Sequence, residues 1–218
     1  FGLFKAQVAT GGTAGPFGYY VSFGSTDSDG YRDYAAQERR RLFSNFTWEL
    51  SDKTDLRFDL IYANVDEELP GSLTREEFDR NPRQANANNK ANRYGRDYDF
   101  VHAGFALDHR FDDRNVSALS VHGHVRDVVH PIFQILDQYQ STLGVDIAYR
   151  RTGERSRLLI GFAPQGGGNE ETRFENLSGA PGDMTAEFET DVLNLELYGE
   201  LQYDLTPESM LVLGGRYD

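Results

Sequence analysis

The feature that most constrains this chain is a two-residue alternation of apolar and polar side chains, which recurs along its 218 residues. In residues 56–63, for example, the apolar side chains fall at even positions, and Arg57 and Asp59 fall between them. Because successive side chains of a β-strand point to opposite faces, this pattern predicts strands with one apolar and one polar face. The clearest examples are residues 42–50, 56–63, 101–111, 143–150 and 193–203.

The segments between these strands predict how the strands are connected. Short polar turns and longer irregular stretches alternate along the chain, so all short turns fall at one end of the strands and all long loops at the other. Turns of two to five residues join antiparallel neighbours, which predicts about ten strands in an up-and-down order. The short turns are expected at 11–15, 51–55, 112–115, 152–155 and 206–209, and the long loops at 25–37, 67–97, 129–139 and 167–188.

Two all-β architectures fit this pattern: a soluble β-sandwich that acts as a binding module, and a transmembrane β-barrel. The barrel is favoured because the strands are about 9–12 residues long, as tilted membrane-spanning strands need to be. The segregation of short turns from long loops and the full charges on the polar face also fit a barrel with a wet lumen. Seven aromatic residues near strand ends are candidates for the interfacial girdles of such a barrel: Phe17, Tyr19, Trp48, Tyr62, Phe111, Tyr149 and Tyr203.

Charge and composition exclude several function classes. The net charge is −13 and the sequence pI is near 4.8, which argues against a nucleic-acid partner because phosphate binding needs a basic face. Cysteine is absent, so neither a disulfide framework nor a thiolate metal site is expected. No catalytic or nucleotide-binding motif occurs, and we predict no catalytic residue and no cofactor. The chain begins at Phe1 without a signal-peptide pattern, as a mature or internal piece would.

Three stretches, at residues 29–85, 130–138 and 193–218, together resemble TonB-dependent outer-membrane receptors, and the ferric-citrate and ferric-siderophore receptors most of all. The first is DGYRDYAAQERRRLFSNFTWELSDKTDLRFDLIYANVDEELPGSLTREEFDRNPRQA, residues 29–85. The others are HPIFQILDQ, residues 130–138, and LNLELYGELQYDLTPESMLVLGGRYD, residues 193–218, which ends in a "G.RYD" strand typical of the family. The resemblance covers essentially residues 1–218, and it places them in the middle of the barrel.

The resemblance implies a 22-stranded barrel filled by a plug domain, in the outer membrane of a Gram-negative bacterium. Residues 1–218 are interpreted as part of one such barrel domain, without the plug domain and the remaining strands, because ten strands alone would leave two unpaired edges in lipid. The implied function is TonB-dependent uptake of a ferric siderophore or other iron chelate, with no reaction catalysed. The implied partners are the chelate, outer-membrane lipid, the plug and, through the plug, TonB. The alternative is a small self-closing barrel that acts as a diffusion porin or outer-membrane enzyme.

The long loop at 67–97 holds the candidate ligand contacts. Thr74 and Glu77 have the spacing of a capping box, which predicts a short helix ended by Pro82. Further on, Arg93, Tyr94 and Arg96 could reach the carboxylates of a ferric chelate, because arginine offers a bidentate fork. The competing interpretation is a solvated, mobile loop.

Two further motifs contain residue types that often bind metal ions. His122 and His124 alternate on the polar face of their strand; a metal could bind such a pair, but contacts with a plug or water are commoner, and no metal site is predicted. Asp27, Asp29 and Gly30 form the D-x-D-G that often begins a calcium loop. Strands are predicted on both flanks, so the motif is interpreted as a turn in which Gly30 takes a positive φ.

Overall fold

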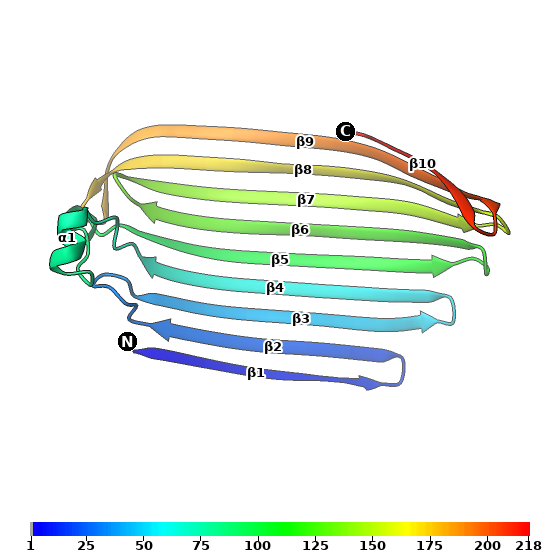
Figure 1. The fold of residues 1–218 in the computed structure, drawn as a ribbon, viewed down its shortest axis with the longest axis horizontal. Coiled ribbons are helices and arrows are strands. Elements are labelled where there is room, and N and C mark those ends of the chain that lie inside the picture. Colours follow the sequence, from blue (N-terminus) through cyan, green and yellow to red (C-terminus); the bar gives the residue numbers. More distant parts are fainter. Residues whose placement is uncertain (1) are drawn as a thin grey trace.

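The computed structural model describes residues 2–218 and contains one ten-stranded antiparallel sheet, in which every strand pairs with its neighbours in sequence (Figure 1). This arrangement confirms the predicted up-and-down order. Two short helices lie in the connection between the fourth and fifth strands, and neither is long and apolar enough to cross a membrane. The elements are β1 (Leu3–Ala14), β2 (Phe17–Ser28), β3 (Gln37–Ser51), β4 (Thr54–Glu68), α1 (Arg75–Arg80), α2 (Ala87–Ala91), β5 (Gly95–Arg110), β6 (Asn115–Pro131), β7 (Gln134–Thr152), β8 (Ser156–Leu177), β9 (Ala180–Thr206) and β10 (Ser209–Tyr217).

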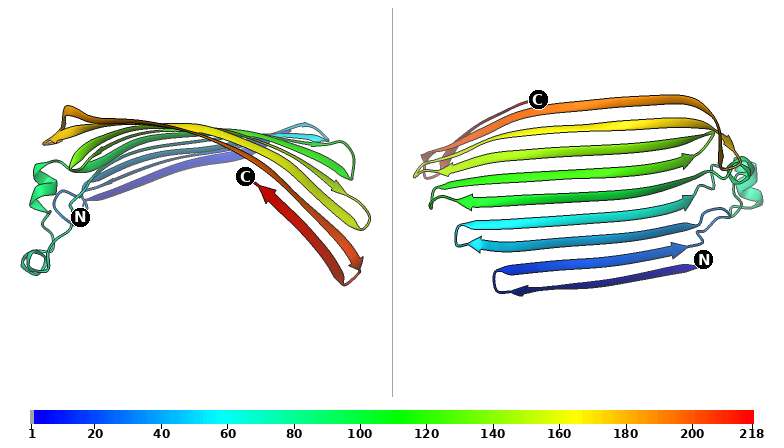
Figure 2. Two further views of the ribbon diagram at one scale, coloured as in Figure 1. Left: turned by 90° about the horizontal axis from the view of Figure 1, so that it is seen from above. Right: turned by 180° about the vertical axis from the view of Figure 1, so that it is seen from behind.

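The sheet is curved and open. Figure 2 shows it bent like a section of a barrel wall, and Figure 1 places β1 and β10 at opposite edges. Within residues 2–218, β1 pairs only with β2 and β10 pairs only with β9. These ten strands therefore do not close on themselves, and the alternative of a self-closing ten-stranded barrel is wrong for this structure.

Two of the four predicted long loops are strands instead. The stretch 129–139 contains the end of β6 and the start of β7, and the stretch 167–188 contains the end of β8 and the start of β9. The β8–β9 hairpin turns through Ser178 and Gly179, whose φ values are 56° and 90°. The prediction failed at 167–188 because residues 167–176 are mostly polar on both faces. It failed at 129–139 because apolar residues there stand in adjacent pairs, such as Val128–Val129 and Ile135–Leu136, and do not alternate with polar ones.

The other two loops are shorter than predicted, at residues 29–36 and 69–94. Gly30 has a φ of 75°, and a Cβ there would lie 2.3 Å from the carbonyl oxygen of Ala35, so glycine is needed at this turn. Asp27 lies on β2, and the backbone N–H of Asp29 donates to the carbonyl of Gly2. The D-x-D-G motif is thus a strand end and a turn, as predicted.

The predicted helix in the long loop is also confirmed. The hydroxyl of Thr74 accepts a hydrogen bond from the backbone N–H of Glu77 at 3.2 Å, and the Glu77 carboxylate accepts one from the backbone N–H of Thr74 at 2.8 Å. This reciprocal capping box starts α1, which ends at Arg80, two residues before Pro82.

The capping box gives α1 a pH dependence. Hydrogen bonds from the backbone and side chain of Thr74 lower the pKa of Glu77. Because the folded-state pKa is depressed, the stabilisation is present above the ordinary carboxyl pKa and is lost as the pH falls through the folded value. We expect the protection of residues 77–81 against amide exchange, corrected for intrinsic rates, to fall between about pH 6 and about pH 3. The amide oxygen of Glu77→Gln can still accept the hydrogen bond but does not titrate, so this variant should show the same protection at both pH values. A retained pH dependence in this variant would contradict the assignment.

The register places apolar side chains in continuous rows on one face of the sheet, here called the apolar face. In the middle row, Phe46 pairs with Phe58, Phe58 with Phe105 and Phe105 with Val121. The ring centroids of Phe46 and Phe58 are 6.0 Å apart, and those of Phe58 and Phe105 are 4.7 Å apart. Five such rows, each two residues from the next, span roughly 27 Å along the strands and about 20 Å at a barrel tilt, which approaches the height of a membrane-spanning band.

The opposite face, here called the polar face, lies on the concave side of the sheet. Side chains spread apart on a convex surface and crowd together on a concave one. On the apolar face Leu143 and Leu193 are 62% and 72% exposed, whereas on the polar face Val65 and Val128 are each 2% exposed. The helix α1 also hangs on the concave side in Figure 2.

Candidate functional site

The end of the sheet that carries the long loops, here called the loop end, has a basic polar face. Three successive rows of the register between β3 and β9 place five arginines and only two glutamates on this face. This patch has a positive charge although the whole chain is at −13. The arginines, here called the cationic patch, are Arg39, Arg41, Arg96, Arg126 and Arg173, and the glutamates are Glu67 and Glu171.

The apolar face at the same level is acidic. Its two outermost rows between β3 and β9 hold nine carboxylates and a single basic residue, Arg40, which pairs with Glu38 at 3.1 Å. Adjacent residues such as Arg96 and Asp97, or Arg126 and Asp127, therefore point their opposite charges to opposite sides of the wall. The nine are Glu38, Asp66, Asp97, Asp99, Asp127, Asp137, Glu170, Glu187 and Glu189.

Two buried carboxylates hold three of the arginines in place. Glu67, 8% exposed, binds both Arg96 and Arg39, the latter at 3.4 Å. Glu171, 9% exposed, binds Arg173 and accepts a hydrogen bond from the side-chain amide of Gln138. Each glutamate thus orients guanidinium groups at the loop end, and Glu67 neutralises only one of its two partners.

The remaining two arginines of the patch have no ion pair within residues 2–218. These are Arg41, which is exposed, and Arg126, whose guanidinium carbon lies 5.6 Å from the ring centroid of Tyr98. Guanidinium groups without a carboxylate partner can bind an anion that carries carboxylate or catechol-like oxygens.

A hollow of about 440 Å³ lies next to the cationic patch. It forms where β8 carries three consecutive glycines, Gly166–Gly168, and so presents no side chains. Among its lining residues, Asn169 has a buried side-chain oxygen without a hydrogen-bond partner in the described part of the chain. Its lining can therefore accept and donate hydrogen bonds to a ligand held by the arginines; the polar side chains are His124, Gln140, Ser141, Thr142, Gln165, Asn169, Thr190 and Asn194.

The loops at the loop end are tied to each other by one arginine. The guanidinium of Arg32, in loop 29–36, donates to the carbonyl oxygens of Gly71 at 2.5 Å, Pro70 at 3.1 Å and Gln84 at 2.9 and 3.0 Å. The backbone N–H of Asp33 donates to the carbonyl of Arg83 at 2.7 Å. These hydrogen bonds join loop 69–94 to loop 29–36.

The structure separates the three ligand-contact candidates. Arg96 belongs to the cationic patch and pairs with Glu67. Tyr94 stays within its own loop, where its hydroxyl accepts a hydrogen bond from the Asn88 amide at 3.1 Å. Arg93, with a φ of 50°, lies against Gly179 of the β8–β9 turn.

Arg93 also lines a hollow of about 290 Å³ on the acidic side, with Tyr34, Glu68 and Asp97. Burial raises the pKa of the Tyr34 phenol, and the Glu68 carboxylate raises it further, whereas Arg93 lowers it. Arg93 and Arg96 therefore contact different surroundings, and the three candidates do not form one cluster.

Sequence reasoning missed most of the cationic patch. Arg39, Arg41, Arg126 and Arg173 were not singled out, because loops rather than strands were expected to hold the ligand contacts. The two-residue alternation could have identified them if it had been extended into the charged strand ends. In E-R-R-R at 38–41, the odd positions Arg39 and Arg41 lie on the polar face of the same strand.

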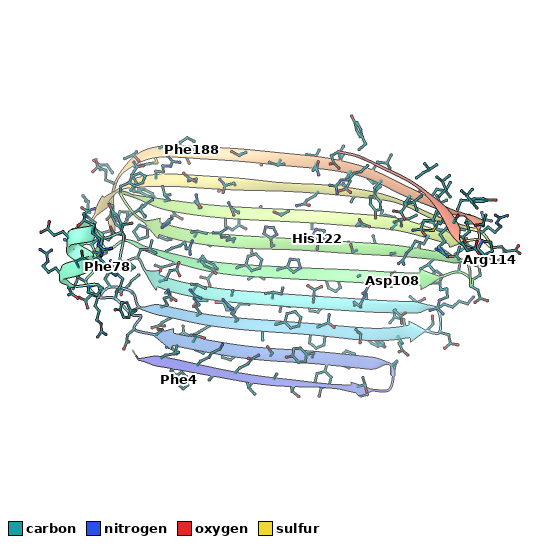
Figure 3. All side chains as sticks on the ribbon, viewed as in Figure 1. Phe4, Phe78, Asp108, Arg114, His122 and Phe188 are labelled. Carbon is teal, nitrogen blue, oxygen red and sulfur yellow. The ribbon has the colours of Figure 1, made fainter. Side chains whose placement is uncertain are left out.

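The polar face changes its chemistry along the strands. Three histidines follow the cationic patch in the middle of the sheet, where Figure 3 shows His122. Carboxylates such as Asp55, Asp108 and Asp146 follow toward the short turns, and Figure 3 shows Asp108 near that end. Arginines lie among these carboxylates, and Arg57 pairs with Asp108 at 2.7 Å. The polar face is therefore basic at the loop end, carries imidazoles in the middle and is mixed in charge toward the turn end.

Comparison with known proteins gives matches at the level of structure alone. No protein-family model and no curated protein sequence matches this chain. The pyoverdine outer-membrane receptor FpvA of Pseudomonas aeruginosa PAO1, bound to pyoverdine, superimposes with a TM-score of 0.82 at 13% identity, over 98% of this chain and 38% of the receptor. The ferric citrate transporter FecA gives 0.71 at 12% identity, over 97% and 40%. The copper transporter OprC gives 0.69 at 12% identity, over 97% and 35%.

These proteins are TonB-dependent outer-membrane receptors. The chain therefore has the fold of part of the barrel of such a receptor, as the sequence resemblance implied. It spans about two fifths of the length of FecA and less of FpvA and OprC.

Proposed function

We propose that residues 1–218 belong to the barrel domain of a TonB-dependent receptor that takes up an anionic ferric chelate, such as a ferric siderophore or ferric citrate. The plug domain and further barrel strands would lie outside this chain. The apolar face would contact lipid of the Gram-negative outer membrane, and the polar face would line the lumen. This chain would supply wall and mouth loops, and it would catalyse no reaction.

The observation that carries the proposal is the cationic patch on the concave polar face. In the barrel arrangement it lies just inside the mouth, where an incoming ligand first meets the lumen wall. An excess of arginine at that place, on a chain with a net charge of −13, favours an anionic ligand. The fold alone does not determine which ligand is taken up, because a copper transporter has a similar fold.

The test is equilibrium binding of ferric citrate and of ferric siderophores to the purified protein in detergent. Arg41→Glu and Arg126→Glu place a negative charge in the patch without breaking an ion pair between residues 2–218. We expect each to weaken binding of an anionic chelate by about tenfold or more, because a charge reversal replaces attraction by repulsion in a partly enclosed site.

The matched control is Arg40→Glu, which makes the same charge change between Arg39 and Arg41 but on the opposite face. Its binding should stay within about twofold of the unaltered protein. Equal losses for Arg40→Glu and Arg41→Glu would show that only net charge matters. Tight binding of an uncharged chelate, unaffected by the patch variants, would overturn the proposed ligand class.

A further inference from the structure

We propose that His102, His122 and His124, supported by Asp59, form a site on the polar face for a divalent transition ion such as Cu²⁺ or Zn²⁺. The register brings these residues together from three strands. His102 of β5 stands directly opposite His124 of β6, and His122 follows two residues away on the same face of β6. Asp59 of β4 pairs with Gly104 and is therefore a diagonal neighbour of His102. Directly opposed residues have Cβ atoms about 5 Å apart, close enough for two imidazoles to share one ion.

Neighbouring strands already orient two of the rings. The Nε2 atom of His102 lies 3.2 Å from a carboxylate oxygen of Asp59, and the Nε2 atom of His124 lies 3.2 Å from the hydroxyl oxygen of Thr142. When Nε2 is held in this way, Nδ1 is the nitrogen left to bind a metal. A carboxylate or hydroxyl behind a ligating histidine is the usual outer partner, because it fixes the tautomer and makes the ring more basic.

The imidazole of His122 has room to become the third metal ligand. The ring centroids of His102 and His122 are 6.5 Å apart, and His122 lies over Gly144, where a Cβ would come within 2.6 Å of its Nε2 atom. Two imidazoles on one tetrahedral ion have centroids about 5 Å apart, given metal–nitrogen distances near 2.0–2.1 Å. As the side chains lie, no three such groups in residues 2–218 converge on one point. Formation of the site therefore requires these side chains to reorient around the incoming ion.

The ligand set decides the class of metal. Imidazole nitrogens suit copper, zinc and nickel ions, whereas magnesium and calcium require several oxygen ligands. The cluster offers three imidazoles and one carboxylate, and the chain has no cysteine. The site requires no assumption about which chelate the protein takes up.

The experiment titrates the purified protein in detergent with Cu²⁺ and with Zn²⁺ by calorimetry, and records the electron paramagnetic resonance of the Cu²⁺ complex. We expect one ion per chain and hyperfine coupling to imidazole nitrogen. His102→Ala and His124→Ala should each weaken binding at least about tenfold, and Asp59→Asn should weaken it about tenfold through the orientation of His102.

The chain supplies its own controls in the two histidines outside the cluster. His109 contacts Thr54 and Phe111 on the other face, and His130 lies near Arg96 at the loop end. His109→Ala and His130→Ala should bind both ions as the unaltered protein does. Losses of the same size in these controls, absence of nitrogen coupling, or competition by excess Mg²⁺ would each overturn the proposal. Unchanged thermal unfolding of the apo variants separates loss of ligands from loss of fold.

Discussion

Phe105→Arg is expected to lower the free energy of unfolding in lipid vesicles by about 3–5 kcal/mol. Phe105 is 52% exposed in the middle row of the apolar face, where the proposed barrel meets the centre of the bilayer. A lipid-facing arginine at the midplane costs about 2–4 kcal/mol, and loss of the ring contact with Phe58 adds about 1 kcal/mol. The measurement is reversible denaturant unfolding of the purified protein in phospholipid vesicles, followed by tryptophan fluorescence from Trp48.

The matched control is Ser120→Arg. Ser120 precedes Val121, the residue that pairs with Phe105, and its side chain lies on the polar face. Ser120 stands directly opposite Asp146, so a new guanidinium there meets a carboxylate and, in the proposed lumen, water. We expect a change below about 1 kcal/mol. Similar effects for both substitutions would contradict the assignment of the apolar face to lipid. They would also favour the soluble sandwich considered from the sequence.

Arg32→Ala is expected to release loop 69–94. It removes the guanidinium that donates to the carbonyl groups of Gly71, Pro70 and Gln84 and leaves these acceptors without their charged partner. Hydrogen bonds to charged groups are worth about 1.5–3 kcal/mol each, and partial exposure of the site lets water replace some of them. We expect local opening to become easier by about 2–4 kcal/mol, which corresponds to roughly 30- to 1000-fold faster amide exchange in this loop.

Hydrogen exchange and limited proteolysis of the intact protein would measure this release. Arg32→Lys should behave nearly like Arg32→Ala, because an ammonium group cannot reproduce the planar fork. Arg75→Ala is the control: it breaks an ion pair with Asp79 in the same loop, but that side chain is 85% exposed. It should change exchange by less than about threefold. If amide exchange in Arg32→Ala were as slow as in the unaltered protein, the hydrogen bonds of Arg32 would not be what holds the loop.

The sequence predicted the parts of this fold in which local chemistry repeats. The number of strands, their order, the apolar face, the turn at Gly30 and the capping box of α1 all follow from patterns within a few residues. The sequence pattern did not predict that β6, β7, β8 and β9 extend beyond the apolar rows. Residues 167–176 are mostly polar, whereas the apolar residues at the ends of β6 and β7 stand in adjacent pairs and do not alternate. Ser178 and Gly179 close the β8–β9 hairpin within a stretch whose composition is also typical of a loop.

The candidate site was less predictable than the fold, because it depends on the register between strands. Arg39, Arg126 and Arg173 are far apart in sequence and become one surface only when β3, β6 and β8 are aligned. His102 and His124 become direct neighbours for the same reason. Arg93, Tyr94 and Arg96 are adjacent in sequence but enter different surroundings, and their contact with a ligand stays a prediction.

The opposite charges of adjacent residues at the loop end have a consequence for folding fidelity. A slip of one residue between neighbouring strands exchanges the faces of one strand. At the loop end, such a slip of β5 would turn Arg96 outward among carboxylates and bring Asp97 into the lumen beside arginines, so that unlike charges would become neighbours. Strand ends that are polar on both faces lack a hydrophobic penalty against misalignment. The alternation of charge therefore does not oppose a slip of one residue, and the register at the loop end is set by the apolar rows in the middle of the same strands.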